Sequence, residues 1–420
     1  MFHTKMFKAK TFIAACSLGL ISGSVAIPAS AADSPAMPAN MPGMKMSSAT
    51  GGAVKIADPT SVVMIVNRDS NDIGFMDIKT KKMIGNVFLG NNVNPHMVMM
   101  SPDGRYVVTG GTRANKAYII ETATLKLVKE IPVDIAPEHL SFSPDSRWYY
   151  QGNPDGDSIS VIDMQSLTKV KTIPGFAEPL NVTFTADGSK AYVGNYGAHW
   201  VGVVDVKRHE LLKKIQIAAP GSRSGLDPER YLGEIKGINV AAPSIDGRYL
   251  YAADSDLAVV GVIDTREDKL IKTIPVGKNP WRIYMGHDGK YAITINNGDE
   301  TISIIDLQKN EVAATLEAGP DMTGVNFAGG KAFVISSTSS FVYVYDMKTL
   351  KSAGRIKIGT NVQLETATTD TADEKIYLAS STENAVVIID AKTLAFEKIK
   401  NVGSYPWGTH IMDSKDNYCH

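Results

Sequence analysis

The feature that most constrains this chain is a short β-rich segment that ends in an acidic residue and recurs eight times. The acids that end the copies are Asp77, Glu121, Asp163, Asp205, Asp264, Asp306, Asp346 and Asp390. Successive acids are 44, 42, 42, 59, 42, 40 and 44 residues apart. This period is typical of the four-stranded blades of a β-propeller, because each sheet needs a neighbouring copy to cover its apolar faces. We therefore expect an all-β, eight-bladed propeller of antiparallel blades, with seven blades as the alternative.

The segment 270–306 shows the content of one unit. Its runs of Ile, Val, Thr and Tyr have the length of strands, and Gly, Asn or Asp bound each run. An Asp-Gly turn at 288–289 predicts a hairpin, because Asp bonds to the nearby backbone and Gly adopts positive φ. We expect 279–306 to supply three strands and 270–276 to supply the fourth strand of the same sheet.

The repeat predicts one domain over residues 61–412 whose ends meet. The pattern begins near Ser61 with a second strand and ends near Met412 with a first strand, so one blade must combine both segments. Closing the ring in this way removes an exposed sheet edge. The longest interval contains about 17 extra residues at 219–237, which we interpret either as a lid or as a plain surface loop. Residues 413–420 form a C-terminal tail.

The first 60 residues differ in composition from the repeats. Three lysines, an apolar run and Ala29-Ser30-Ala31 are typical of a cleaved secretory signal over residues 1–31, which predicts a periplasmic or secreted protein. Cleavage before Cys16, as in a lipoprotein, is the alternative. Residues 32–60 form a linker rich in Met, Pro and Gly that we expect to be disordered. Its methionines are either part of a simple tether or a Cu(I) site: Met37, Met41, Met44 and Met46.

Charge and cysteine content exclude several classes of protein. Without the signal, 40 basic and 44 acidic residues remain, a balance that does not favour nucleic-acid binding. No other apolar run is long enough to span a bilayer, so we expect no transmembrane anchor. Cys419 is then the only cysteine, which excludes an internal disulfide. We expect a soluble monomer.

Short motifs connect the chain with a known family. The recurring Val-Ile-Asp strands, Ser-Pro-Asp-Gly-Arg-Tyr at 101–106 and Ala-Tyr-Val-Gly-Asn at 191–195 resemble the bacterial YVTN-repeat propellers, the YncE-like proteins. With eight blades, the chain is also similar to the haem-binding propeller of the cytochrome-type nitrite reductases. His96 stands nine residues before Arg105, the spacing of that family's axial haem histidine, so the resemblance implies a haem ligand at His96.

The same resemblance does not extend to the whole active site of that family. Its two further active-site histidines lie in later blades, where this chain has Trp281 and Arg282 or Gln363 at the corresponding strand starts. The chain also has no Cys-x-x-Cys-His motif for covalent haem. These departures weigh against nitrite reduction by that mechanism.

Aligning the eight innermost strands on a shared apolar residue reveals a mostly polar position just before it. The aligned apolar residues are Val98, Leu140, Val182, Val240, Ile283, Val325, Leu364 and Ile411. The residues before them are Met97, His139, Asn181, Asn239, Arg282, Gly324, Gln363 and His410. We expect this position to face the mouth of the central channel, where propellers bind ligands.

Three histidines are the strongest candidates for metal ligands. His96, His139 and His410 fall on consecutive blades once the ring closes, with Met97 and Met412 beside them. Imidazole with thioether suits copper, and imidazole alone suits zinc or a haem iron. The alternatives are hydrogen-bonded wall residues, or a small organic anion held by stacking and charge. Candidates for the anion site are Asn181, Asn239, Trp281, Arg282, Gln363 and Trp407.

The sequence contains no nucleophile elbow, phosphate loop or His-Glu-x-x-His motif, which favours a binding or accessory protein over a stand-alone enzyme. Our first hypothesis is an exported propeller that binds a metal ion, with copper favoured, or haem, and that works with a periplasmic protein partner. The alternative is an oxidoreductase that uses non-covalent haem or copper at the same site. A protein–protein interaction scaffold is the second alternative.

Overall fold

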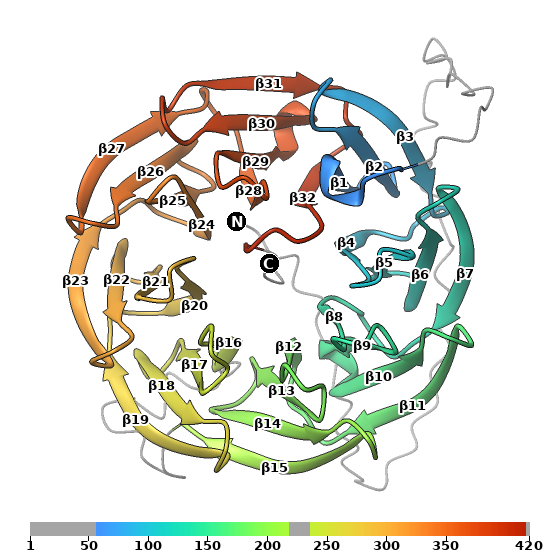
Figure 1. Ribbon diagram of the computed structural model, residues 1–420, viewed down its shortest axis with the longest axis horizontal. Helices are drawn as coiled ribbons and strands as arrows, with labels where there is room; N and C mark the ends of the chain where they lie inside the picture. Colours follow the sequence, from blue (N-terminus) through green and yellow to red (C-terminus); the bar gives the residue numbers. More distant parts are fainter. Residues whose placement is uncertain (1–55, 218–235, 417–420) are drawn as a thin grey trace, which may run out of the picture. The chain divides into compact units, whose positions relative to one another are not determined.

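A computed structural model describes residues 56–217 and 236–416, and these residues form eight four-stranded antiparallel sheets in a ring (Figure 1). The all-β, eight-bladed propeller is therefore confirmed. Several predicted features lie outside the described residues: the signal 1–31, the methionines at 37–46, nearly all of the insertion 219–237, and Cys419. No helix among the described residues is long and apolar enough to cross a membrane.

Each blade has its first strand nearest the axis of the ring and its fourth strand at the perimeter (Figure 1). Blade 1 contains β32 (Pro406–His410), β1 (Val62–Asn67), β2 (Asp72–Asp77) and β3 (Lys82–Phe88). Blade 2 contains β4 (Pro95–Met100), β5 (Tyr106–Gly111), β6 (Lys116–Glu121) and β7 (Lys126–Pro132). Blade 3 contains β8 (Leu140–Phe142), β9 (Trp148–Asn153), β10 (Ser158–Asp163) and β11 (Thr168–Pro174). Blade 4 contains β12 (Pro179–Phe184), β13 (Lys190–Asn195), β14 (Trp200–Asp205) and β15 (Glu210–Gln216).

The second half of the ring repeats this order. Blade 5 contains β16 (Ile238–Pro243), β17 (Tyr249–Asp254), β18 (Val259–Asp264) and β19 (Lys269–Pro275). Blade 6 contains β20 (Pro280–Met285), β21 (Tyr291–Asn296), β22 (Thr301–Asp306) and β23 (Glu311–Glu317). Blade 7 contains β24 (Met322–Ala328), β25 (Lys331–Ser336), β26 (Phe341–Asp346) and β27 (Lys351–Lys357). Blade 8 contains β28 (Leu364–Thr369), β29 (Lys375–Ser380), β30 (Ala385–Asp390) and β31 (Phe396–Lys400). Short 3₁₀ turns precede or join strands at η1 (Pro59–Ser61), η2 (Pro154–Gly156) and η4 (Ser381–Glu383).

The recurring acid has a structural role at the turn into the outermost strand. Asp77 Oδ1 accepts a hydrogen bond of 2.7 Å from the Thr80 backbone N–H, and Asp390 Oδ1 accepts one of 2.8 Å from that of Thr393. This turn joins the third strand of a blade to the fourth, outermost strand of the same blade, so the fourth strand comes directly after the acid in the sequence. The prediction that 270–276 joins the sheet of 279–306 was therefore wrong, since β19 pairs with β18 in blade 5.

The ring closes through β1 and β32. Met64 pairs with His410 and Ile65 with Thr409, so strands from the two ends of the described range share one sheet, as the sequence predicted. The interior consists of apolar faces from neighbouring blades. Where blades 1 and 8 meet, for example, Val63 and Ile65 pack with Tyr377 and other buried residues. Burial of these faces is the main source of stability.

Glycines in the second strands let the next blade approach closely. A Cβ atom on Gly110 of β5 would lie 2.9 Å from the Pro137 carbonyl oxygen, and one on Gly152 of β9 would lie 2.9 Å from that of Leu180. Gly194 of β13 meets the Asn239 carbonyl oxygen at 2.9 Å in the same way. These contacts fix where each inner strand begins. We call the end of the ring where inner strands begin the mouth end, and the other the far end.

The far end is occupied by residues that follow β32. Asp416 is 1% exposed, and its carboxylate accepts hydrogen bonds from the Phe327 backbone N–H (2.9 Å), the Asn326 side-chain amide (3.3 Å) and the Thr369 hydroxyl. His287, in the turn after β20, lies 2.7 Å from Asp416 through Nε2 and 2.8 Å from Asp373 through Nδ1. Part of the predicted tail, 413–416, is thus fixed against blades 6, 7 and 8.

Candidate functional site

The strand pairings show which inner-strand residues lie at the same level. In blades 2, 4, 5, 6 and 8 the inner strand pairs regularly from its fourth residue, after a register shift that leaves the second and third residues outside the ladder. In blades 1 and 7 only the second residue is left out, and pairing resumes at Gly408 and Gly324. The second residues are His96, Glu138, Leu180, Asn239, Trp281, Thr323, Glu365 and Trp407. The third residues are Met97, His139, Asn181, Val240, Arg282, Gly324, Thr366 and Gly408. Both sets lie near the mouth end.

This register corrects the alignment made from apolar residues. Met97, His139, Asn181, Arg282 and Gly324 share a level, as the sequence alignment had them. Three other members of that alignment do not: Asn239 is a second residue, Gln363 precedes β28, and His410 is the fifth residue of β32. The error arose because apolar side chains occur at several levels of these buried strands, so matching them does not fix a register interrupted by a bulge.

Three side chains of blades 2 and 3 converge at the mouth end. One ligand atom from each of His96, Glu138 and His139 lies within 4.8 Å of the other two, and this is the one such His, Cys, Asp or Glu group in the described residues. The imidazole rings of the two histidines are 5.9 Å apart. Neighbours in a regular strand point to opposite faces, but Glu138 and His139 precede the first residue of β8 and so can approach one ligand together. Two imidazoles and one carboxylate form a typical ligand set for zinc and other divalent transition metals.

The carboxyl group of Glu138 is in an unfavourable place for a negative charge. Burial, and then the charge of Asp155, raise the pKa of Glu138 to about 7, although Arg282 and Arg68 partly oppose this shift. A nearby cation would favour the ionised form. Binding of a metal ion would therefore compete with a proton at this group near neutral pH.

Blade 1 contributes an aromatic and cationic wall beside the histidines. The Trp407 ring lies 5.6 Å from the His96 ring and is stacked at 6.3 Å on Tyr405. Arg68, in the turn after β1, places its guanidinium carbon 4.2 Å from the centre of the Trp407 ring and 5.7 Å from that of Tyr405. Trp407 was predicted as a ligand-binding residue, whereas the sequence analysis did not identify Arg68.

A second carboxyl group stands on the other side of this wall. Glu365 is the second residue of β28, is 1% exposed and accepts a 2.7 Å hydrogen bond from the Ser381 hydroxyl. Burial raises the pKa of Glu365 to about 7, against the opposing effects of Ser381 and Arg68. Glu365 and Glu138 were both missed by the sequence analysis.

The remaining predicted ligand residues are engaged in local structure. Arg282 is buried and donates from Nε to Asn239 Oδ1 over 3.0 Å, and its guanidinium carbon is 5.7 Å from the Trp281 ring. Asn181 Oδ1 accepts hydrogen bonds from the Ala241 backbone N–H and the Thr183 hydroxyl. Gln363 donates its backbone N–H to the Thr382 hydroxyl. The structure therefore places these side chains around the mouth end without bringing them to one point.

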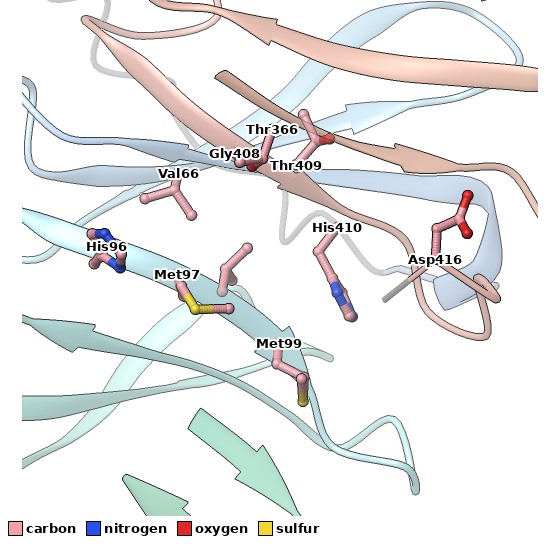
Figure 2. A pocket seen from close by; sticks show the side chains of 10 residues that line it. Val66, His96, Met97, Met99, Thr366, Gly408, Thr409, His410 and Asp416 are labelled. Carbon is pink, nitrogen blue, oxygen red and sulfur yellow. The ribbon is translucent and has the colours of Figure 1, made fainter. Parts of the chain in front are cut away.

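His410 lies deeper along the axis than the histidines of blades 2 and 3. Figure 2 shows His410 between His96 and Asp416, in a small cavity that Met97 and Met99 also line. Burial lowers the pKa of His410 to about 3, and its Nε2 accepts a long, 3.5 Å hydrogen bond from the Met100 backbone N–H. Met97 packs in the apolar cluster of blades 2 and 3, and Met412 packs against that of blades 1 and 2. The structure thus groups His96 and His139 with Glu138, and His410 is not part of that group.

Comparisons with known proteins support the fold alone. No protein-family model matches the sequence, and no curated protein matches it, so membership of the YVTN-repeat family stays a prediction. Among solved structures, dihydro-heme d1 dehydrogenase NirN in complex with DHE has a TM-score of 0.70 at 19% identity, covering 85% of this chain and 76% of NirN. Hydrazine synthase of Kuenenia stuttgartiensis has a TM-score of 0.55 at 19% identity, covering 73% and 97%. A functionally unknown protein of Desulfotomaculum acetoxidans has a TM-score of 0.54 at 12% identity, covering 84% and 98%. The chain is therefore an eight-bladed β-propeller similar in fold to NirN.

Proposed function

We propose that this propeller is a metal-binding or accessory protein that holds one divalent transition-metal ion at its mouth end. The proposal rests on three ligand atoms, one each from His96, Glu138 and His139, that lie within 4.8 Å of one another. Three protein ligands leave a fourth position of a tetrahedral ion for water or another molecule. At equilibrium such a nitrogen and oxygen set binds Cu²⁺ more tightly than Zn²⁺. The two imidazoles and the carboxylate suit Cu²⁺ or Zn²⁺, whereas Cu(I) prefers thioether and thiolate ligands.

Calorimetric titration of the purified protein with Zn²⁺ and Cu²⁺, with a competing chelator, tests this site. We expect one site, and a loss of affinity of at least about a hundredfold in each of His96→Ala, Glu138→Gln and His139→Ala, since loss of an outer-shell partner alone costs roughly 10- to 100-fold. The control Glu130→Gln changes an exposed carboxylate on β7 and should bind normally.

His410→Asn separates this site from the three-histidine site expected from the sequence. Because His410 lies outside the ligand group, the variant should keep its metal affinity. If His410→Asn lost as much affinity as His96→Ala, the three-histidine site would be supported, and normal binding by all four variants would contradict both sites.

A haem-type group is the second candidate ligand. It is favoured by the fold shared with NirN, whose structure contains DHE, and by His96 at the level of the mouth with Trp407 beside it. The residues fit such a group, because the imidazole of His96 could serve as an axial ligand and Trp407 offers an aromatic surface. When bound, the haem iron would supply redox chemistry.

Titration with haemin, followed by absorption in the Soret region, distinguishes the two ligands. A haem site should lose its Soret band in His96→Ala and keep it in Glu138→Gln, whereas a three-ligand metal site depends on both residues. Protein that takes up neither metal nor haem would leave the interaction scaffold as the function.

We further propose that the protein acts in the periplasm, on the basis of the signal-type sequence 1–31. N-terminal sequencing of protein recovered from a periplasmic fraction tests this proposal. Ala32 is the expected first residue, and an intact N-terminus in the cytoplasmic fraction would contradict export.

A further inference from the structure

Arg68 is a positively charged side chain at the mouth end whose position is fixed by aromatic stacking. Its guanidinium lies over Trp407, with 4.2 Å between the guanidinium carbon and the ring centre, and close to Tyr405 at 5.7 Å. Stacking uses the face of a guanidinium and leaves its N–H groups, which lie in the plane at the edge, free to donate. Arg68 forms no ion pair and no hydrogen bond through its side chain with any described residue.

The other stacked arginines of the ring differ in this respect. Arg147 lies 5.1 Å from the Trp148 ring and also forms a 2.7 Å ion pair with Asp163. Arg248 lies 5.6 Å from the Tyr249 ring and contacts Asp264 at 2.5 Å. In both cases the N–H edge is satisfied by the acid that ends a third strand. At Arg68 the stacking is closer, and the edge has no such carboxylate.

Arg68 shares an aromatic wall with the proposed metal ligands. Trp407 contacts the guanidinium of Arg68 and lies 5.6 Å from the ring of His96. Arg68 and the three proposed metal ligands therefore lie in the same part of the mouth end, where the charge of Arg68 also acts on Glu138. A planar fork of N–H donors matches a carboxylate, which accepts two parallel hydrogen bonds.

We propose that Arg68 anchors a small carboxylate that binds together with the metal ion, so that the site takes a metal–carboxylate complex. One carboxylate of such a molecule occupies the open position of the metal, and a second carboxylate accepts hydrogen bonds from Arg68. The ligand class is a small dicarboxylate or a metal-chelating organic acid. This inference rests on the proposed metal site for its first contact and on Arg68 alone for its second.

Calorimetric titration of oxalate into zinc-loaded protein, without excess zinc, tests the proposal. We expect Arg68→Gln to weaken oxalate binding by about tenfold or more, because charge-assisted hydrogen bonds are lost, and to leave zinc affinity within about threefold. Arg68→Lys should restore only part of the affinity, since lysine keeps the charge but lacks the planar fork. The matched control is Arg105→Gln at the far end, where Arg105 also stacks on a tyrosine, at 5.2 Å from the Tyr106 ring. Arg105→Gln should bind oxalate normally.

The outcomes separate this inference from the metal site. Oxalate binding that is equal in wild type and Arg68→Gln would overturn the anchor role. If wild-type protein does not bind zinc, the metal site fails, and the same titration without zinc still tests Arg68: binding that is lost in Arg68→Gln supports the anchor, and its persistence contradicts it. A drop in the unfolding temperature of Arg68→Gln that accompanies loss of both ligands would assign Arg68 a purely structural role.

Discussion

The two ends of this propeller use similar side chains in different ways. At the far end, His287 lies between Asp373 and Asp416, and Asp416 also accepts hydrogen bonds from blades 7 and 8. At the mouth end, His96, Glu138 and His139 converge within 4.8 Å and fit a cation that would join them. At the far end His287 and Asp416 therefore find their partners within the chain, and these contacts contribute to stability. The mouth end collects ligand atoms and a stacked arginine, which is what a binding site requires.

The largest expected effect tests the structural role of the far end and comes from replacing Asp416. Asp416→Ala leaves the buried Phe327 N–H without its acceptor and His287 with Asp373 alone, and loss of one partner from a buried charged pair costs about 3–5 kcal/mol. We expect a large fall in the denaturant midpoint, measured by circular dichroism, with metal affinity unchanged while the protein is folded. The control Asp413→Asn removes the charge of an exposed acid of the same segment and tolerates its φ of 60°, so it should shift stability by less than about 0.5 kcal/mol. Equal effects of the two variants would show that 413–416 does not hold the far end.

A substitution that disturbs the close packing of two blades beside the metal ligands should lower both stability and metal affinity. In Gly110→Val the added side chain collides with the Pro137 carbonyl next to Glu138, so we expect a loss of about 1–3 kcal/mol of stability and about tenfold of metal affinity. Gly194→Val is the matched control, because it makes the same collision with Asn239 of blade 5, away from the three ligands. It should lose similar stability and keep its metal affinity, as measured by thermal unfolding and calorimetry. A loss of affinity in both variants would mean that the site responds to general destabilisation.

The smallest expected effect concerns pH. Burial alone would lower the pKa of His287, but the hydrogen bonds and charges of Asp416 and Asp373 outweigh it and raise the pKa above its ordinary value. A raised folded-state pKa gives stability that is fully present below the unfolded value, near 6.5, and is lost as pH rises through the folded value. The difference in unfolding temperature between wild type and His287→Gln should therefore shrink from pH 6 towards pH 9. A constant or growing difference would contradict a protonated His287 between the two acids.

The fold was predictable because it depends on a period, whereas the site depends on a register. Eight acids at propeller spacing predict eight blades, and the number of blades stays the same when the predicted bounds of a strand are wrong by one or two residues. The residues of a ligand group do depend on such errors, because a register shift of one residue puts His139 at the level where Glu138 lies. The bulge after the first residue of each inner strand made the apolar alignment fail for His410 and Gln363.

The sequence nevertheless contained a better marker of the register. A proline opens the inner strands of blades 2, 4, 6 and 1, and Pro137 stands at the same level in blade 3. Aligning on these prolines, whose fixed φ suits the first residue of a strand, would have placed Glu138 and Trp407 beside His96. Glu365 follows Leu364, so this marker would not have found it. Arg68 had no comparable signal: the pairing of β1 with β32 was predicted, but the stacking of a turn residue on Trp407 depends on side-chain positions that the strand pattern does not give.

The pairing of β1 with β32 also sets the order in which the protein can be completed. Contacts between distant segments form late, because a long loop must close before any of them is gained. Blades 2 to 8 are continuous in sequence and can form as the chain emerges, so His96, Glu138 and His139 are available early. Trp407, which contacts both His96 and Arg68, is part of the closing strand and is therefore synthesised late. Asp416 follows it in the sequence. The binding end is therefore complete only once the closing blade has formed. A chain truncated before β32 would contain His96, Glu138 and His139 but would lack Trp407.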